Sequence, residues 1–402
     1  MNITIDREIL LENLNVISRG LPAKSPMPIL TGIKMEATDT DLYMTSSNTD
    51  ISVEVLISDA SLKITEPGKT VVPGKFFIEI IRKINSKRIN LYLLEDKILV
   101  IKADRGEYKL HIMDYMDYPN IDFVCLENPL VLDASVIKSL IKETVFATAA
   151  SEKKPILTGV NFKHTAGRLV ATATDSFRLS QKIITIENYN DFNITIPNKS
   201  LDELLKAIDS YEDKVTLYFS ANKLLVKYKN VLFQTRLLDG NYPDTSKLIP
   251  NEFPIVIKFN KDELVDAVER VSLLSPRDKE KDKEITYSII KLSIKKDRII
   301  EISSTNATIG DAKEELIPTN IETSNPIVIG FSSRYLLEAL RSFISTEVSL
   351  NLSGEIRPFV IRGDKDANLT QLILPVRMDS VSYKHLRAHE TCADLVCRLL
   401  LE

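Results

Sequence analysis

The chain repeats itself three times, and this repetition constrains its fold more than any other feature does. Asp6, Asp133 and Asn260 lie 127 residues apart, and each precedes a stretch whose apolar residues recur at helical spacing, as in residues 9–17. Asp and Asn are preferred at helix N-caps because their side chains accept hydrogen bonds from first-turn amides. We therefore expect three related domains, each with a helix at the same place.

The same spacing recurs further along each third. The pentapeptide PILTG occupies 28–32 and again 155–159, and a diverged third copy, EITYS, is expected at 284–288. A second helix follows in each third and leads into apolar and polar residues that alternate around a short polar turn, which predicts a hairpin. The predicted second helices span 71–84, 195–208 and 328–343, and the hairpins span 89–103, 215–229 and 348–362. Each third is therefore expected to read strand, helix and three strands, twice over.

This pattern predicts an α+β fold of three repeated domains. Short Pro-containing segments interrupt it near 124–129 and 249–254, and predict the boundaries. The expected domains are 1–125, 126–251 and 252–377, followed by a non-native or appended tail at 378–402. Related domains joined head to tail can continue their sheets across each junction, and a second copy of the chain can close the remaining edges.

The tail differs from the rest in composition. It holds two of the four His and two of the three Cys in the chain, at His385, His389, Cys392 and Cys397. These residue types can bind zinc. An abrupt shift of composition at the end of a repeated pattern favours an appended segment instead, so we expect no metal site.

Composition excludes several classes of protein. The net charge of −4 argues against a protein that grips nucleic acid over its whole surface. Three Cys among 402 residues indicate a reducing cytoplasm, and no stretch reads as a signal peptide or a membrane span. Neither a GxxxxGK[ST] or GxGxxG phosphate loop nor a GxSxG motif occurs, so we expect no cofactor and no enzymatic activity.

Several motifs together resemble one known family. The segments PILTG, VVPGKFF, ATATDSFRLS, LLDGNYPD and QLILPVR are similar, in order and spacing, to the beta subunit of bacterial DNA polymerase III, the sliding clamp. The resemblance covers residues 1–377. It implies three clamp domains per chain and a homodimeric ring with helices on the inner face and sheets outside. It also implies that the ring encircles duplex DNA without sequence specificity, is placed there by an ATP-driven clamp loader, and tethers the replicative polymerase and other DNA-processing proteins.

The resemblance also implies a pocket for short peptides of partner proteins. Leu, Pro and Phe side chains from separate segments are expected to form an apolar hollow, in which Arg178 and Arg377 fix the polar ends of a peptide. The alternative is that these side chains are ordinary core and turn residues. The matching positions are Leu157, Thr174, Ser176, Phe177, Arg178, Leu179, Pro243, Leu248, Arg357, Leu372, Leu374, Pro375 and Arg377.

Two further sets of residues follow from the resemblance. For DNA the matching positions are Lys24, Lys75, Arg82, Lys154, Lys199 and Arg334. Basic side chains on helices can meet phosphates without reading sequence, although most surface lysines are simply solvated. For the dimer contact the matching positions are Tyr108, Leu110, Leu273 and Leu274, with burial in the core as the alternative. Acidic residues at 311, 314 and 315 are expected to face basic residues at 97, 102 and 105 across that contact.

Other functions remain open from the sequence alone. An α+β ligand-binding or enzymatic protein with a small-molecule cavity is the main alternative, and it requires convergent polar residues or a cofactor motif. A diverged clamp that serves only repair or mobile elements is another alternative.

Overall fold

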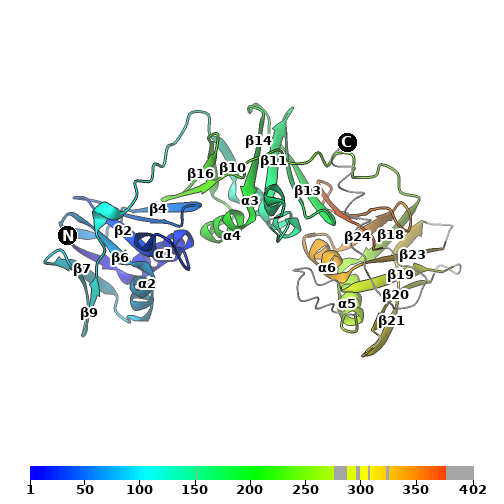
Figure 1. The fold of residues 1–402 in the computed structure, drawn as a ribbon, viewed down its shortest axis with the longest axis horizontal. Coiled ribbons are helices and arrows are strands. Elements are labelled where there is room, and N and C mark those ends of the chain that lie inside the picture. Colours follow the sequence, from blue (N-terminus) through cyan, green and yellow to red (C-terminus); the bar gives the residue numbers. More distant parts are fainter. Residues whose placement is uncertain (152, 276–287, 296–298, 307, 323–325, 377–402) are drawn as a thin grey trace. The chain divides into compact units, whose positions relative to one another are not determined.

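A computed structural model gives the structure of residues 1–151, 153–275, 288–295, 299–306, 308–322 and 326–376. The predicted tail, Arg377 and most of the diverged segment 284–288 lie outside these residues. Within the described residues, six α-helices and 26 strands follow one another in three similar series (Figure 1). None of these helices is long and apolar enough to cross a membrane.

The element order confirms the predicted repeat. The first series is β1 (Asn2–Asp6), α1 (Arg7–Ile17), β2 (Gly32–Ala37), β3 (Leu42–Ser47), β4 (Ile51–Ile57), β5 (Lys63–Glu66), β6 (Gly68–Pro73), α2 (Gly74–Lys83), β7 (Arg88–Leu94), β8 (Ile98–Ala103) and β9 (Gly106–His111). The second is β10 (Leu130–Asp133), α3 (Ala134–Lys142), β11 (Gly159–Thr165), β12 (Arg168–Thr174), β13 (Arg178–Thr185), β14 (Phe192–Pro197), α4 (Asn198–Ala207), β15 (Lys214–Phe219), β16 (Lys223–Tyr228) and β17 (Val231–Arg236).

The third series is β18 (Ile255–Asn260), α5 (Lys261–Ser272), β19 (Ile289–Ile294), β20 (Ile300–Asn306), β21 (Gly310–Leu316), β22 (Asn320–Glu322), β23 (Ile327–Ser332), α6 (Ser333–Arg341), β24 (Glu347–Leu352), β25 (Phe359–Gly363) and β26 (Leu369–Ile373). Strand, helix and three strands therefore recur six times. The short strands β5 and β22 are additions that the sequence pattern did not predict.

Helices α1 and α5 begin after their predicted caps, whereas the second helices begin later than predicted, because residues 71–73, 195–197 and 328–332 belong to β6, β14 and β23. Asp6 accepts a 2.9 Å hydrogen bond from the amide of Glu8 at the start of α1, and Asn260 caps α5 in the same way. The apolar stripe of α1 is buried at Leu10, Leu14 and Ile17. In the first and third domains the paired helices also touch, α1 with α2 and α5 with α6 (Figure 1).

The chain divides into two compact units, and sheets continue between repeats inside both of them. The first unit comprises residues 1–138 and 199–237, and its largest sheet has the order β10-β15-β16-β17-β4-β3-β2-β6. The second unit comprises residues 139–198 and 238–402, and its largest sheet has the order β14-β11-β12-β13-β26-β25-β24-β18-β22. The antiparallel pairs β17–β4 and β13–β26 join one repeat to the next. The predicted continuation of sheets across the junctions is confirmed in each unit.

Each unit also holds a smaller sheet that ends in an open edge. In the first unit the order is β5-β1-β7-β8-β9, and in the second it is β21-β20-β19-β23. Within the described part of the chain, β9 and β21 each pair on one side only. Open edges of this kind invite pairing with another strand.

Candidate peptide pocket and basic surfaces

The turn between β12 and β13 is the centre of the candidate peptide pocket. The carboxylate of Asp175 accepts hydrogen bonds from the backbone amides of Phe177, at 2.9 Å, and Arg178, at 3.0 Å. This is the local bonding by which Asp fixes a turn. Ser176 has a φ of 76°, a left-handed conformation that is costly for a residue with a Cβ. The turn therefore holds a strained backbone by means of the Asp175 side chain.

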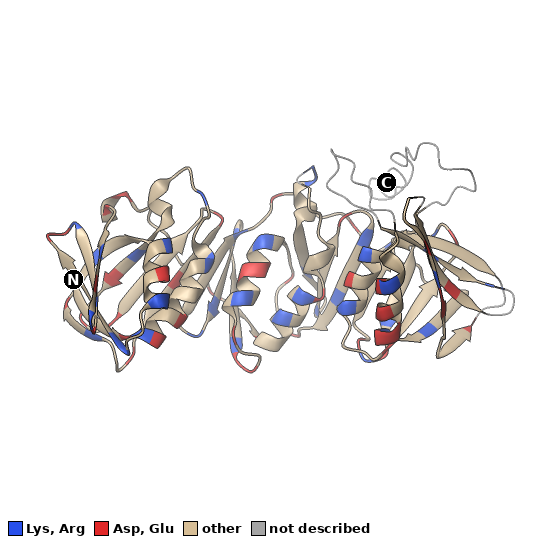
Figure 2. Cartoon of the chain, turned by 90° about the horizontal axis from the view of Figure 1, so that it is seen from below, with Lys and Arg blue, Asp and Glu red and all other residues tan. Residues whose placement is uncertain are grey.

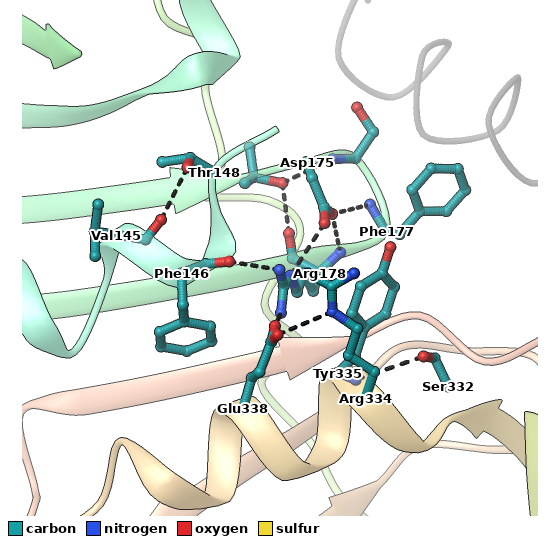
Figure 3. Close-up of polar contacts among 12 residues, drawn as sticks. Val145, Phe146, Thr148, Asp175, Phe177, Arg178, Ser332, Arg334, Tyr335 and Glu338 are labelled. Atoms are coloured by element: carbon teal, nitrogen blue, oxygen red, sulfur yellow. Dashed lines mark hydrogen bonds and ion pairs between the residues drawn. The ribbon is translucent and has the colours of Figure 1, made fainter. Parts of the chain in front are cut away.

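Arg178 is buried among groups of the protein itself (Figure 3). Its Nε donates to Asp175 at 3.0 Å, one Nη donates to Glu338 of α6, and the other donates to the carbonyl oxygen of Phe146. The guanidinium also lies over the rings of Tyr335, 4.4 Å from the ring centre, and Phe146, at 5.4 Å. Its side chain is 6% exposed.

The structure gives the charge of Arg178 partners within the protein, and its contact with a peptide stays a prediction. We expected its charge to fix the polar end of a peptide, but the guanidinium is already bonded to two carboxylates and a carbonyl group. Because the side chain is buried beside these acceptors, its N–H groups bond within the protein. Arg377, which was assigned the same task, lies outside the described residues.

Burial also changes the acids around Arg178. Desolvation by itself would raise the pKa of Glu338, but hydrogen bonds and the charges of Arg178 and Arg334 outweigh it and hold that pKa below 4.5. For Asp175, burial dominates over the neighbouring Arg178 and raises the pKa above 3.8. The network therefore stabilises the charged form of Glu338, whereas burial disfavours the charged form of Asp175.

A row of apolar side chains crosses the sheet beside this turn. Antiparallel pairing sets Leu179 of β13 opposite Leu372 of β26, and Leu372 opposite Val360 of β25. All three are at most 3% exposed, and Leu248 and Phe253 pack against them together with Ile249. The predicted grouping of Leu179, Leu248 and Leu372 is confirmed. Val360 and Phe253 are members that the sequence did not indicate.

Other predicted residues extend the same region of the second unit. The Thr174 amide donates a 3.0 Å hydrogen bond to the hydroxyl of Tyr242, which brings the segment around Pro243 to the end of β12. The Leu374 amide donates to the carbonyl oxygen of Phe177 at 2.9 Å. Thr174, Leu157 and Pro375 are buried, whereas Phe177, Pro243, Leu248 and Leu374 are half-buried. The half-buried residues are the ones available to a ligand, and the buried ones can form only its floor.

A cavity of about 370 Å³ borders this region. It is lined by Glu252, Phe253, Pro254, Ser353 and Arg357. Arg357, an exposed residue, therefore lines a hollow together with Phe253 of the apolar group.

The predicted DNA contacts are all exposed. Lys75 and Arg82 lie on α2, Lys199 on α4 and Arg334 on α6, whereas Lys24 and Lys154 lie in loops. Figure 2 shows that acidic residues are interspersed with the basic ones on the helices. Two of the predicted cations are neutralised locally, Arg82 by Glu79 and Arg334 by Glu338. The helices therefore carry a modest and interrupted positive charge.

The predicted dimer residues lie beside the two open edges. Tyr108, 41% exposed, and the half-buried Leu110 are on β9, whereas Leu273, 69% exposed, ends α5 next to the half-buried Leu274. This degree of exposure favours a surface role for Tyr108 and Leu273 over burial in the core. Glu314 of β21 accepts a 3.1 Å hydrogen bond from Arg270 of α5, so it already has a partner within its own chain, and its contact with a second chain stays a prediction. The neighbouring Asp311 and Glu315 are exposed.

Three repeats of a duplicated strand–helix–three-strand unit, with sheets that run from one repeat into the next, define the processivity-clamp class of protein. The chain belongs to the DNA polymerase III beta subunit family: residues 1–122 match the profile of its N-terminal domain, 131–244 that of its central domain and 246–377 that of its C-terminal domain.

Individual relatives agree with this assignment. The chain is 36% identical to the beta sliding clamp of Bacillus subtilis over 384 residues, which cover 94% of this chain and 100% of the relative. It is 35% identical to the beta sliding clamp of Staphylococcus aureus over 383 residues, or 94% of this chain and 99% of the relative. The crystal structure of the DNA polymerase sliding clamp from Bacillus subtilis superposes with a TM-score of 0.88 at 35% identity, again over 94% of this chain and 100% of that one.

Proposed function

We propose that this protein is a DNA sliding clamp that works as a homodimer. Two copies join into a closed ring, duplex DNA passes through it, and the ring keeps the replicative polymerase and other DNA-processing proteins on their template. The protein then acts through topology and catalyses no reaction. Any ATP or polymerase chemistry belongs to its partners, including the clamp loader, and its place of action is the cytoplasm.

One observation carries this proposal. The sheets continue from repeat to repeat through β17–β4 and β13–β26, yet β9 and β21 keep an open edge. A second copy related by twofold symmetry can pair β9 of one chain with β21 of the other, twice, which covers both of these edges in each chain. Exposed apolar side chains at Tyr108 and Leu273 support contact at these edges.

The charge distribution supports sliding rather than tight binding. A net charge of −4 and helices with mixed charges favour few phosphate contacts. The slope of log affinity against log salt concentration is proportional to the number of such contacts. Lys24, Lys75, Lys154 and Lys199 are the proposed contacts, with Arg82 and Arg334 as neighbours that share their charge with glutamates.

The half-buried apolar residues of the second unit are proposed as the site where partners attach. Phe177, Pro243, Leu248 and Leu374 offer partly exposed apolar surface, and Leu248 packs against the buried row of leucine and valine side chains. Such a surface suits a short peptide with one or two large apolar side chains. A pocket for peptides lets one clamp serve several partners in turn.

The deciding experiment asks whether the protein is linked to DNA by topology. The full chain is loaded on nicked circular DNA by a clamp loader with ATP, and the circle is then cut once. We expect the protein to stay on the circle through gel filtration and to be lost after linearisation. Linear DNA with both ends blocked should retain the protein. Equal retention on circular and unblocked linear DNA, or none on either, would exclude a sliding clamp.

A further inference from the structure

One carboxylate of α6 binds two arginines with different surroundings. An oxygen of Glu338 accepts from Arg178, whose side chain is 6% exposed, and its other oxygen accepts from Arg334 at 2.9 Å, whose side chain is 59% exposed (Figure 3). Arg178 belongs to the middle repeat, whereas Glu338 and Arg334 belong to the third. Glu338 therefore ties a buried cation of one repeat to a helix of the next.

The buried cation needs this partner. Taking a charged side chain out of water costs several kcal/mol unless opposite charge and hydrogen bonds compensate it. Asp175 and Glu338 supply the two negative charges within bonding distance of Arg178, and the ring of Tyr335 covers its guanidinium face. With Glu338 neutral, Asp175 would have to balance the charge by itself.

Asp175 already has another task. The same carboxylate accepts the amides of Phe177 and Arg178 and so maintains the turn in which Ser176 takes its strained φ of 76°. Strained backbone persists only where its surroundings over-determine it. Drawing the Asp175 carboxylate toward the guanidinium would loosen those amide bonds. The orientation of Phe177, and with it the Leu374 contact at 2.9 Å, would then change.

We propose that Glu338 is a positioning residue of the peptide pocket. From the third repeat it holds Arg178, and through Arg178 and Asp175 it fixes the turn at 175–178 that presents Phe177 to a peptide. The inference rests on the proposed peptide-binding function and deepens it, because it makes peptide affinity depend on an ion pair formed between two repeats.

The test measures peptide affinity in the full-length protein by fluorescence anisotropy. The probe is a labelled hexapeptide ending in Leu-Phe, and its counterpart ending in Ser-Ser is the probe control. The variants are Glu338→Gln, which removes the charge at constant size, and Glu338→Asp, which keeps it. Glu269→Gln is the matched control, because Glu269 of α5 pairs with Arg341 of α6, the helix that carries Glu338, and both side chains are well exposed.

We expect Glu338→Gln to weaken binding by about tenfold, which lies within the range of coupling between residues of one salt-bridge network. Glu338→Asp should retain more affinity than the Gln variant, and Glu269→Gln should match the unaltered protein. In an Arg178→Ala background the Gln substitution should have no further effect, since coupled residues are not additive. Circular dichroism spectra and thermal unfolding midpoints identify any variant that has lost its fold.

The outcomes separate the two proposals. Failure of the Leu-Phe peptide to bind the unaltered protein better than the Ser-Ser peptide contradicts the peptide pocket itself. If the unaltered protein binds the Leu-Phe peptide and the Glu338→Gln variant binds it with the same affinity, only the role of Glu338 is contradicted. Equal losses in the Gln and Asp variants, or additive losses with Arg178→Ala, also overturn that role, because they point to packing instead of charge.

Discussion

The hydroxyl of Tyr242 accepts a 3.0 Å hydrogen bond from the backbone amide of Thr174, and this bond fastens the DGNYPD segment to the end of β12. The first repeat places Tyr118 at the corresponding position, against the backbone amide of Ser47, but there the hydroxyl does not reach hydrogen-bond geometry. Ser47 and Thr174 are 127 residues apart, the period of the repeat. Two related tyrosines thus differ in one hydrogen bond.

Replacing Tyr242 by Phe should destabilise the second unit. The substitution leaves the amide of the buried Thr174 without this partner, and a buried amide that loses its hydrogen bond costs about 1–3 kcal/mol. Tyr118→Phe is the matched control and should cost less, because it removes a buried hydroxyl that already lacks a full hydrogen bond. Calorimetric unfolding of both variants gives the comparison. Equal destabilisation would mean that the ring position, and not the bond, accounts for the effect.

The ion pair of Glu338 should make stability depend on pH in a defined window. The pKa of Glu338 is held below its ordinary 4.5 in the folded protein, so the folded state favours the charged form. Its contribution to stability is then complete above that ordinary value and is lost as the pH falls through the depressed folded pKa.

The measurement compares the unaltered protein with Glu338→Gln. The difference in their free energies of unfolding should be constant near neutral pH and should shrink steadily below about pH 4.5. Asp175, whose pKa burial raises, is present in both proteins, so its own titration largely cancels. A difference that stays constant down to pH 3 would show that Glu338 contributes by packing alone.

The sequence predicted the repeated architecture well because that architecture rests on local patterns. The N-caps at Asp6 and Asn260, the buried stripe of α1 and the alternation in the hairpins are each encoded within about fifteen residues. The added edge strands β5 and β22 were missed, since three or four residues carry too little alternation to indicate a strand.

The candidate pocket was predicted less completely, for a different reason. Leu179 and Leu372 were proposed together from family motifs, and the β13–β26 register sets them opposite each other. Their neighbour Val360 and the network around Arg178 had no comparable signal. Glu338 is 160 positions from Arg178, and no periodicity in a single sequence specifies which charges meet over that distance. The same limit made Arg178 look like a free cation.

Binding of the free protein to linear DNA should be weak and should fall steeply with salt. Lys75 on α2 and Lys199 on α4 are exposed and are proposed to meet phosphates. Each phosphate contact that is lost should lower the slope of log affinity against log salt by about 0.9. The double variant Lys75→Ala with Lys199→Ala should therefore show a shallower slope by anisotropy titration. Lys227→Ala, an exposed lysine of strand β16, is the control and should leave the slope unchanged.

The results that would contradict this assignment are clear. Affinity on linear DNA that is equal at low and high salt would exclude phosphate contacts altogether. A slope altered as much by Lys227→Ala as by the helix variants would mean that the contacts are diffuse and are not made by α2 and α4.

The dimer contact provides the last prediction. Leu273 is 69% exposed at the end of α5, and the half-buried Leu274 follows it. An apolar side chain is less favourable in water than when it is buried in a contact. Replacing both by Asp should remove apolar contact and place two charges in the proposed interface, which destabilises association at little cost to the fold of the protomer. Light scattering should give a dimer mass for the unaltered protein and a monomer mass for the variant. Ile344→Asp is the control and should leave the dimer intact, since Ile344 is 76% exposed and follows Phe343, whose carbonyl oxygen accepts a hydrogen bond from Lys261 at the opposite end of α5. A dimer mass for the Leu273 and Leu274 variant would mean that these leucines lie outside the contact, and a monomer mass for the unaltered protein would remove the basis for a two-subunit ring.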